Sequence, residues 1–109
     1  MTDPLTRTLA AVADPTRRTV LQRLAHGPAT VGQLAGLVPM SREAVSQHLR
    51  VLRDAGLMRP TSANRLSPYE LAAEPLLETE AWLRRLVQTW SGAPSARVAG
   101  RRPRSEVPR

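Results

Sequence analysis

The sequence predicts a mainly α-helical fold in which four helices precede a small β-hairpin and a last, longer helix. Three observations predict it. Apolar residues recur three and four positions apart through most of the first 90 residues, which is the period of an amphipathic helix. Asp, Thr or Ser stands before each of the first four stretches, where a helix cap is expected. Glycine and proline separate the stretches.

The first two helices are both expected to begin at an Asp-Pro pair. Asp3-Pro4 places a capping carboxylate before a proline at the first helical position, and Asp14-Pro15 repeats the arrangement. The apolar stripe of the first helix consists of Leu5, Leu9 and Val12. The inward stripe of the second consists of Val20, Leu21 and Leu24. Gly27-Pro28 stops the second helix.

A short third helix and a longer fourth helix follow. Thr30 and Gln33 have the spacing of a capping box at the start of the third helix, and Pro39 comes after its end. Its inward residues are expected to be Val31, Leu34 and Leu37. Ser41 caps the fourth helix, which is expected to run over residues 41–55 and to stop at Gly56.

Beyond the fourth helix, two short extended segments, residues 57–61 and 66–71, flank a polar tip at residues 62–65. Asn64 in the tip tolerates a positive φ, which suits a hairpin turn. Each segment contains a proline, which keeps a strand short or at a sheet edge. The sequence therefore predicts a small hairpin.

The last helix is expected to start near Glu74-Pro75 and to reach Trp90. Residues 91–109 combine three prolines and five arginines with few large apolar side chains, so we expect them to form a disordered basic tail. The folded domain then spans residues 1–90. A domain of this size is small enough for dimerisation to help its stability.

Charge and composition indicate the class of partner. The 109-residue chain carries 16 basic residues, all arginine, against 9 acidic ones, a formal net charge of +7. Residues 14–65 carry +5 and residues 91–109 carry +4, whereas residues 66–90 carry −2. Clustered arginine attracts phosphate, which indicates a polyanionic partner. Solubility and codon bias are an equally good explanation on composition alone.

Composition also excludes several kinds of site. Cysteine is absent, which removes disulfides, thiolate metal sites and thiol chemistry. His26 and His48 are too few and too far apart for the usual metal-ligand spacings, so no metal and no cofactor are expected. No catalytic pattern is visible, so the chain is expected not to be an enzyme. Without a long apolar run or the features of a signal peptide, we expect an intracellular protein with no membrane partner.

The fourth helix has two contrasting sides. Val45, Leu49 and Leu52 share one side and are expected to be buried. The opposite side carries Glu43, Ser46, Gln47 and Arg50. Gln and Arg make bidentate contacts with adenine and guanine edges, and a preceding short helix and tight turn give helix-turn-helix geometry. An ordinary amphipathic helix with a solvated polar side is the alternative.

These segments resemble the ArsR/SmtB family of bacterial winged helix-turn-helix repressors. The resemblance lies in Asp14-Pro15-Thr16-Arg17-Arg18, in the pattern Ser-x-x-x-Val-Ser-x-His-Leu-x-x-Leu that begins at Ser41, and in Arg65-x-x-x-Tyr69-x-Leu71. It covers roughly residues 4–90. The resemblance implies a winged helix-turn-helix fold, in which the hairpin is the wing and the last helix is the dimerisation helix.

The resemblance also implies a function. It implies a cytoplasmic, nucleoid-associated homodimer that represses transcription by binding double-stranded DNA at an inverted-repeat operator, with the helix at residues 41–55 in the major groove. The residues at the family's DNA-contacting positions are Ser41, Arg42, Ser46, Gln47, His48, Arg50 and Arg65. We expect Gln47 and Arg42 to read bases, and Ser41, Ser46 and Arg50 to lie nearer to phosphates. For His48, a structural role and a base contact remain alternatives.

The implied dimer interface consists of Leu5, Leu9, Val12, Leu76, Trp82, Leu83, Leu86, Val87 and Trp90. A place for the two tryptophans in the protomer's own core is the alternative. Glu43 departs from the family, which commonly has a neutral residue at this position. We expect Glu43 to favour the first helical turn electrostatically, rather than to accept a hydrogen bond from cytosine N4.

The effector is left unknown. Metal-sensing and thiol-sensing relatives use cysteines in the third helix or Asp/His ligands in the last helix, and this chain has neither set, which disfavours both signals. A small organic ligand, a protein partner or no effector remain open. A winged-helix protein-interaction module, or a small-ligand-responsive regulator with weakened DNA binding, is the alternative function. An RNA-binding module is disfavoured because the basic middle has no aromatic residue before Tyr69.

Overall fold

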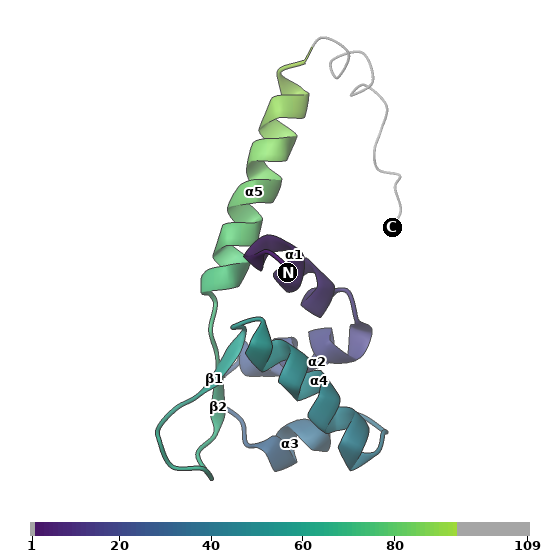
Figure 1. Ribbon diagram of the computed structural model, residues 1–109, viewed down its shortest axis with the longest axis vertical. Helices are drawn as coiled ribbons and strands as arrows, with labels where there is room; N and C mark the ends of the chain where they lie inside the picture. Colours follow the sequence, from purple (N-terminus) through teal and green to yellow (C-terminus); the bar gives the residue numbers. More distant parts are fainter. Residues whose placement is uncertain (1, 94–109) are drawn as a thin grey trace. The chain divides into compact units, whose positions relative to one another are not determined.

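The computed structural model describes residues 2–93, which contain five helices and a two-stranded antiparallel sheet (Figure 1). The elements are α1 (Pro4–Val12), α2 (Pro15–Leu24), α3 (Val31–Ala35), α4 (Arg42–Asp54), β1 (Met58–Pro60), β2 (Tyr69–Leu71) and α5 (Glu74–Ser91). This order confirms the predicted mainly α winged helix-turn-helix fold. The chain divides into two compact units, up to Thr79 and from Glu80 onward, and each is described by itself. Most of the predicted tail, from residue 94, lies outside the described residues.

Local capping fixes the helix starts, as predicted. In each of the first four helices, the cap side chain accepts a hydrogen bond of 3.0–3.1 Å from the backbone N–H three residues later, which would otherwise have no partner. The cap residues are Asp3, Asp14, Thr30 and Ser41. α4 ends as predicted because Gly56 adopts a positive φ of 75°.

The core of the first unit is formed by α1–α4 and the hairpin (Figure 1). The predicted stripe of α4 is buried: its members are Val45, Leu49 and Leu52. The predicted stripe of α2, Val20, Leu21 and Leu24, is buried as well. These two helices therefore present apolar sides to one shared core, which holds α4 in a fixed orientation and directs its polar side outward.

The stripe of α3 differs from the prediction. The expectation that Val31, Leu34 and Leu37 all face inward is wrong, because only Leu34 is buried. α3 is five residues long and ends at Ala35, so Leu37 lies beyond it. In α1 the buried residues are Thr8 and Ala11, because the core meets a different side of the helix from its leucine stripe.

The hairpin is shorter than predicted and closes differently. Its two strands have three residues each, with Met58 opposite Leu71. The expectation of a positive φ at Asn64 is wrong, because no non-glycine residue within residues 2–93 has one. Instead, the side-chain oxygen of Asn64 accepts a hydrogen bond of 2.8 Å from the Leu66 N–H, and its carbonyl accepts one of 2.9 Å from the Ser67 N–H. Side-chain hydrogen bonds therefore close the tip, although no residue in it has a positive φ.

The second strand also connects the hairpin to the start of the helix-turn-helix. Tyr69 and Ala29 exchange two backbone hydrogen bonds of 2.8 and 2.9 Å. Ala29 lies immediately before Thr30, the cap of α3, and is buried. This pairing fixes one end of the wing against the helical core, and the sequence pattern did not predict it.

Truncation of Leu52 tests this core. Leu52 is fully buried, so Leu52→Ala should lower the free energy of unfolding by about 3 kcal/mol through lost burial and a residual cavity. Its neighbour Val51 is 36% exposed, and Val51→Ala should cost less than about 1 kcal/mol. Urea unfolding followed by circular dichroism measures both. Equal losses for the two variants would contradict the described burial.

Candidate nucleic-acid interface

The outward side of α4 carries most of the residues that the sequence predicts to contact DNA. Exposed side chains from three successive turns line a shallow hollow of about 390 Å³: Arg42, Glu43, Ser46, Gln47 and Arg50. Ser41, the helix cap, is also exposed. The hollow has hydroxyl, amide and guanidinium groups, which are the groups that recognise base edges and phosphates.

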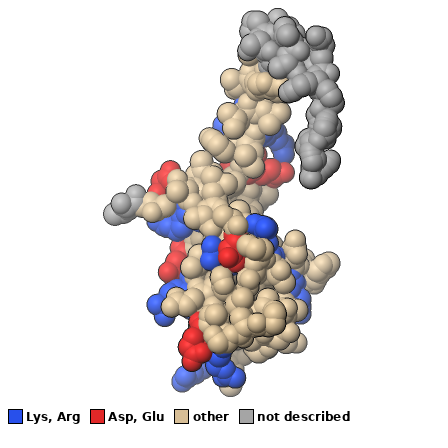
Figure 2. Space-filling view, turned by 90° about the vertical axis from the view of Figure 1, so that its right-hand side faces the viewer, with Lys and Arg blue, Asp and Glu red and all other residues tan. Residues whose placement is uncertain are grey.

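Most arginines between residues 14 and 65 bind the protein itself. The side chains of Arg17, Arg18 and Arg23 donate hydrogen bonds to backbone carbonyls. Arg59 pairs with a carboxylate across the hairpin, and Arg53 lies over the ring of Tyr69, 5.7 Å from its centre. The net charge of +5 therefore does not act as one basic surface. Figure 2 shows blue and red side chains mixed over the face in view.

Three arginines of this region remain available to a ligand. Within residues 2–93, Arg42, Arg50 and Arg65 make no hydrogen bond or ion pair through their guanidinium groups. Arg42 and Arg50 line the hollow on α4. Arg65 is exposed in the tip of the wing. All three were among the predicted DNA contacts, and the structure leaves their charges uncompensated.

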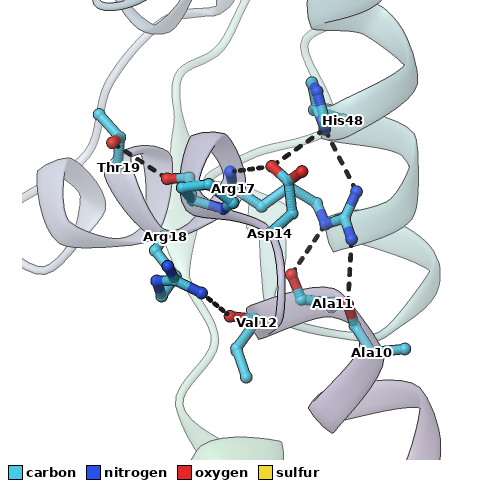
Figure 3. A network of polar contacts seen from close by, with 9 residues as sticks. Ala10, Ala11, Val12, Asp14, Arg17, Arg18, Thr19 and His48 are labelled. Carbon is cyan, nitrogen blue, oxygen red and sulfur yellow. Dashed lines mark hydrogen bonds and ion pairs between the residues drawn. The ribbon is translucent and has the colours of Figure 1, made fainter.

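His48 lies apart from the hollow, in a network that joins three helices (Figure 3). Arg17 donates hydrogen bonds to the carbonyls of Ala11 (2.8 Å) and Ala10 (3.0 Å) at the end of α1, and its Nη1 lies 3.2 Å from Nδ1 of His48 in α4. Arginine can only donate, so Nδ1 of His48 accepts this hydrogen bond, which requires the ring proton to be on Nε2. Because Nδ1 is occupied, only Nε2 is left for a DNA contact.

Asp14 completes the network. Its Oδ2 accepts the 3.0 Å hydrogen bond from the Arg17 N–H and lies 3.7 Å from His48 Nδ1. That hydrogen bond, together with the neighbouring charge of Arg17, outweighs the opposing effect of burial and holds the pKa of the Asp14 carboxyl below its ordinary value. The carboxylate is thus ionised at neutral pH, where it caps α2. No local pattern indicates the role of Arg17, because its contact joins positions 17 and 48.

The predicted dimer residues differ in exposure. On the part of α5 that belongs to the second unit, four large apolar side chains are 45–58% exposed: Leu83, Leu86, Val87 and Trp90. Trp82 and Leu5 are half-buried, and Leu9 is 37% exposed. Val12 and Leu76 pack against the core of the first unit, so part of their apolar surface is already buried within the protomer.

Comparison with known proteins agrees with this geometry. A family model described as a helix-turn-helix domain matches residues 12–61. The HTH-type transcriptional regulator Rv2034 of Mycobacterium tuberculosis is 53% identical over 72 residues, which cover 62% of this chain and 67% of that protein. The transcriptional repressor SdpR of Bacillus subtilis is 30% identical over 67% of this chain and 81% of its own length. A solved ArsR family transcriptional regulator has a TM-score of 0.76 and 36% identity over 84% of this chain and all of its own.

The chain belongs to the ArsR family. As an ArsR/SmtB-type protein with a helix-turn-helix, it is a DNA-binding transcriptional regulator. The relatives named above are transcriptional regulators. No described helix is long and apolar enough to cross a membrane. Within residues 2–93, no three His, Asp or Glu side chains gather where they could hold a metal ion.

The arginine network predicts a specific effect of Arg17→Met. The variant leaves the last carbonyls of α1 and Nδ1 of His48 without their donor, so the free energy of unfolding should fall by about 2 kcal/mol. The ¹⁵N shifts of His48 should also change, because its tautomer is no longer fixed. In the control Arg18→Met, which loses one carbonyl contact at Val12, the His48 shifts should stay unchanged. Unaltered His48 shifts in Arg17→Met would contradict the network.

Proposed function

We propose that the chain is a homodimeric repressor that binds an inverted-repeat operator with α4 in the major groove. The observation that carries this proposal is the outward side of α4, where Ser46, Gln47 and Arg50 lie exposed beside Arg42, whose guanidinium group has no partner in the described residues. A helix whose opposite side is anchored in the core can present these groups to base edges as a rigid unit.

The chemistry of each side chain on α4 determines which part of the DNA it is proposed to contact. Gln47 and Arg42 are proposed to read bases, since amide and guanidinium groups pair bidentately with adenine and guanine. Ser41, Ser46 and Arg50 are proposed to contact phosphates, and Arg65 to reach the backbone or the minor groove from the wing. His48 would contribute one donor, Nε2, from its fixed tautomer.

The dimer is proposed to form through α5. Leu83, Val87 and Trp90 recur at helical spacing on one side, and all are about half exposed in the single chain. A second copy of the chain, packed against this side of α5, would remove the apolar surface from water. Leu5 and Leu9 of α1 are also proposed to contact the partner protomer.

Repression, rather than activation, is supported by the relative SdpR, which is named a repressor. A dimer on promoter DNA would act by occupying the site that polymerase needs. We propose that it does so in the cytoplasm, associated with the nucleoid. Release by a thiol or by a Cys-bound metal is disfavoured, since the chain has no cysteine.

The double change Gln47→Ala/Arg50→Ala tests the recognition helix. Loss of one base contact and one phosphate contact should weaken operator binding roughly 100-fold and reduce the slope of log K against log salt by about 1. The matched control is Arg85→Ala/Gln88→Ala, which removes the same side chains from exposed positions on α5. Fluorescence anisotropy with labelled promoter DNA measures both. Unchanged affinity of the α4 variant would contradict the assignment.

Leu83→Glu tests the dimer. A charge in the apolar stripe should produce a species that sediments at 12.0 kDa, whereas the wild-type chain should sediment at about twice that mass. Leu83 is 45% exposed, so the fold of the monomer should persist by circular dichroism. Arg85→Glu places the same side chain on the opposite side of the helix and should stay dimeric. A Leu83→Glu dimer would contradict the proposed interface.

A further inference from the structure

Glu43 lies among the candidate DNA contacts but has the opposite charge. It is in the first turn of α4, two positions after the cap Ser41, and is exposed. It lines the same hollow as Arg42 and Gln47. Within residues 2–93 its carboxylate makes no ion pair and no hydrogen bond. The start of the helix is favourable for a negative charge, but no partner neutralises this one.

A carboxylate at this position restricts the bases that α4 can approach. The N-terminal residues of a recognition helix are those that reach base edges in the major groove. An ionised carboxylate only accepts hydrogen bonds. Guanine offers N7 and O6 and thymine offers O4, all acceptors, so opposite these bases Glu43 would lose water without gaining a partner. Cytosine N4 and adenine N6 are the amino donors available.

Cytosine suits Glu43 better than adenine. Adenine places the acceptor N7 beside its N6 amino group, a pair that matches an amide such as that of Gln47 and repels a carboxylate. Cytosine presents its N4 amino group alone. Arg42 and Arg50 on the same hollow offset the repulsion between Glu43 and the phosphates, so the carboxylate can enter the groove.

The geometry points to Glu43 as a specificity-determining residue that selects a cytosine in each operator half-site. In place of the purely electrostatic role that the sequence suggested, it accepts a hydrogen bond from cytosine N4, and it disfavours guanine and thymine at that position because they leave it unpaired. Most of its effect is therefore exclusion of wrong bases rather than added affinity. This inference rests on the proposed insertion of α4 in the major groove.

The test is selection of binding sites from a pool of randomised duplexes with the full chain, followed by affinity measurements on single-base variants of the selected site. Three proteins are compared: wild type, Glu43→Gln and Glu78→Gln. Glu78 is an exposed glutamate of α5 outside the hollow, so its change removes the same charge elsewhere. An amide at position 43 can both donate and accept, so it can pair with adenine and no longer excludes guanine or thymine.

The wild type and Glu78→Gln should select a half-site with one C·G pair whose replacement weakens binding roughly tenfold or more. Glu43→Gln should lose the preference at that pair alone, with less than about a threefold effect. Identical preferences for wild type and Glu43→Gln, with only a change in stability, would overturn the inference and leave the proposed function intact. A preference lost at a pair other than C·G would also overturn it. Failure of the wild type to enrich any site would overturn the proposed function and the inference together.

Discussion

The hydrogen bonds of the Arg17 guanidinium are the polar interaction that joins the helices of the first unit. One side chain closes the carbonyl end of α1 and reaches Nδ1 of His48 in α4. The backbone of the same residue donates to Asp14, which caps α2. Three helices therefore share one residue, and this contact supports the orientation of α4 that the shared apolar core sets. A bidentate, permanently charged group suits this role, because it can satisfy several carbonyl acceptors at once without losing its proton.

The network changes how the net charge is understood. Arginine-rich composition indicates a phosphate partner, yet the first three arginines of the basic region support the fold, and a fourth, Arg59, is paired with Glu70 and lies 3.8 Å from Glu74. What remains for DNA is a small set of guanidinium groups on α4 and at the wing tip. Recognition would then depend on a few well-placed groups, with limited help from a general electrostatic field. In such an interface, a single carboxylate such as Glu43 would strongly influence which DNA sequences α4 can bind.

The wing shows how backbone pairing, rather than sequence pattern, positions a functional loop. Its strands are only three residues long and would be marginal alone. The hydrogen bonds between Tyr69 and Ala29 anchor them next to the cap of α3, and the tip is closed by the side chains of Ser62, Asn64 and Ser67. Arg65 is thereby presented from an ordered tip. The sequence suggested a positive φ at Asn64, which asparagine tolerates. The loop between Pro60 and Tyr69 is longer than a tight hairpin turn, so it closes without a positive φ.

The sequence by itself determined the elements: Asp3, Asp14, Thr30 and Ser41 mark helix starts, Gly56 ends α4, and the stripe of Val45, Leu49 and Leu52 fixes which side of α4 is buried. These features are local, since capping and helical periodicity involve residues within a few positions of each other. Only the tertiary structure decided that Thr8 and Ala11, not the leucines of α1, meet the core, and that Arg17 binds His48. Such contacts depend on how the helices pack against one another. Arg17 and His48 are 31 positions apart, and no periodic pattern in the sequence indicates that they meet.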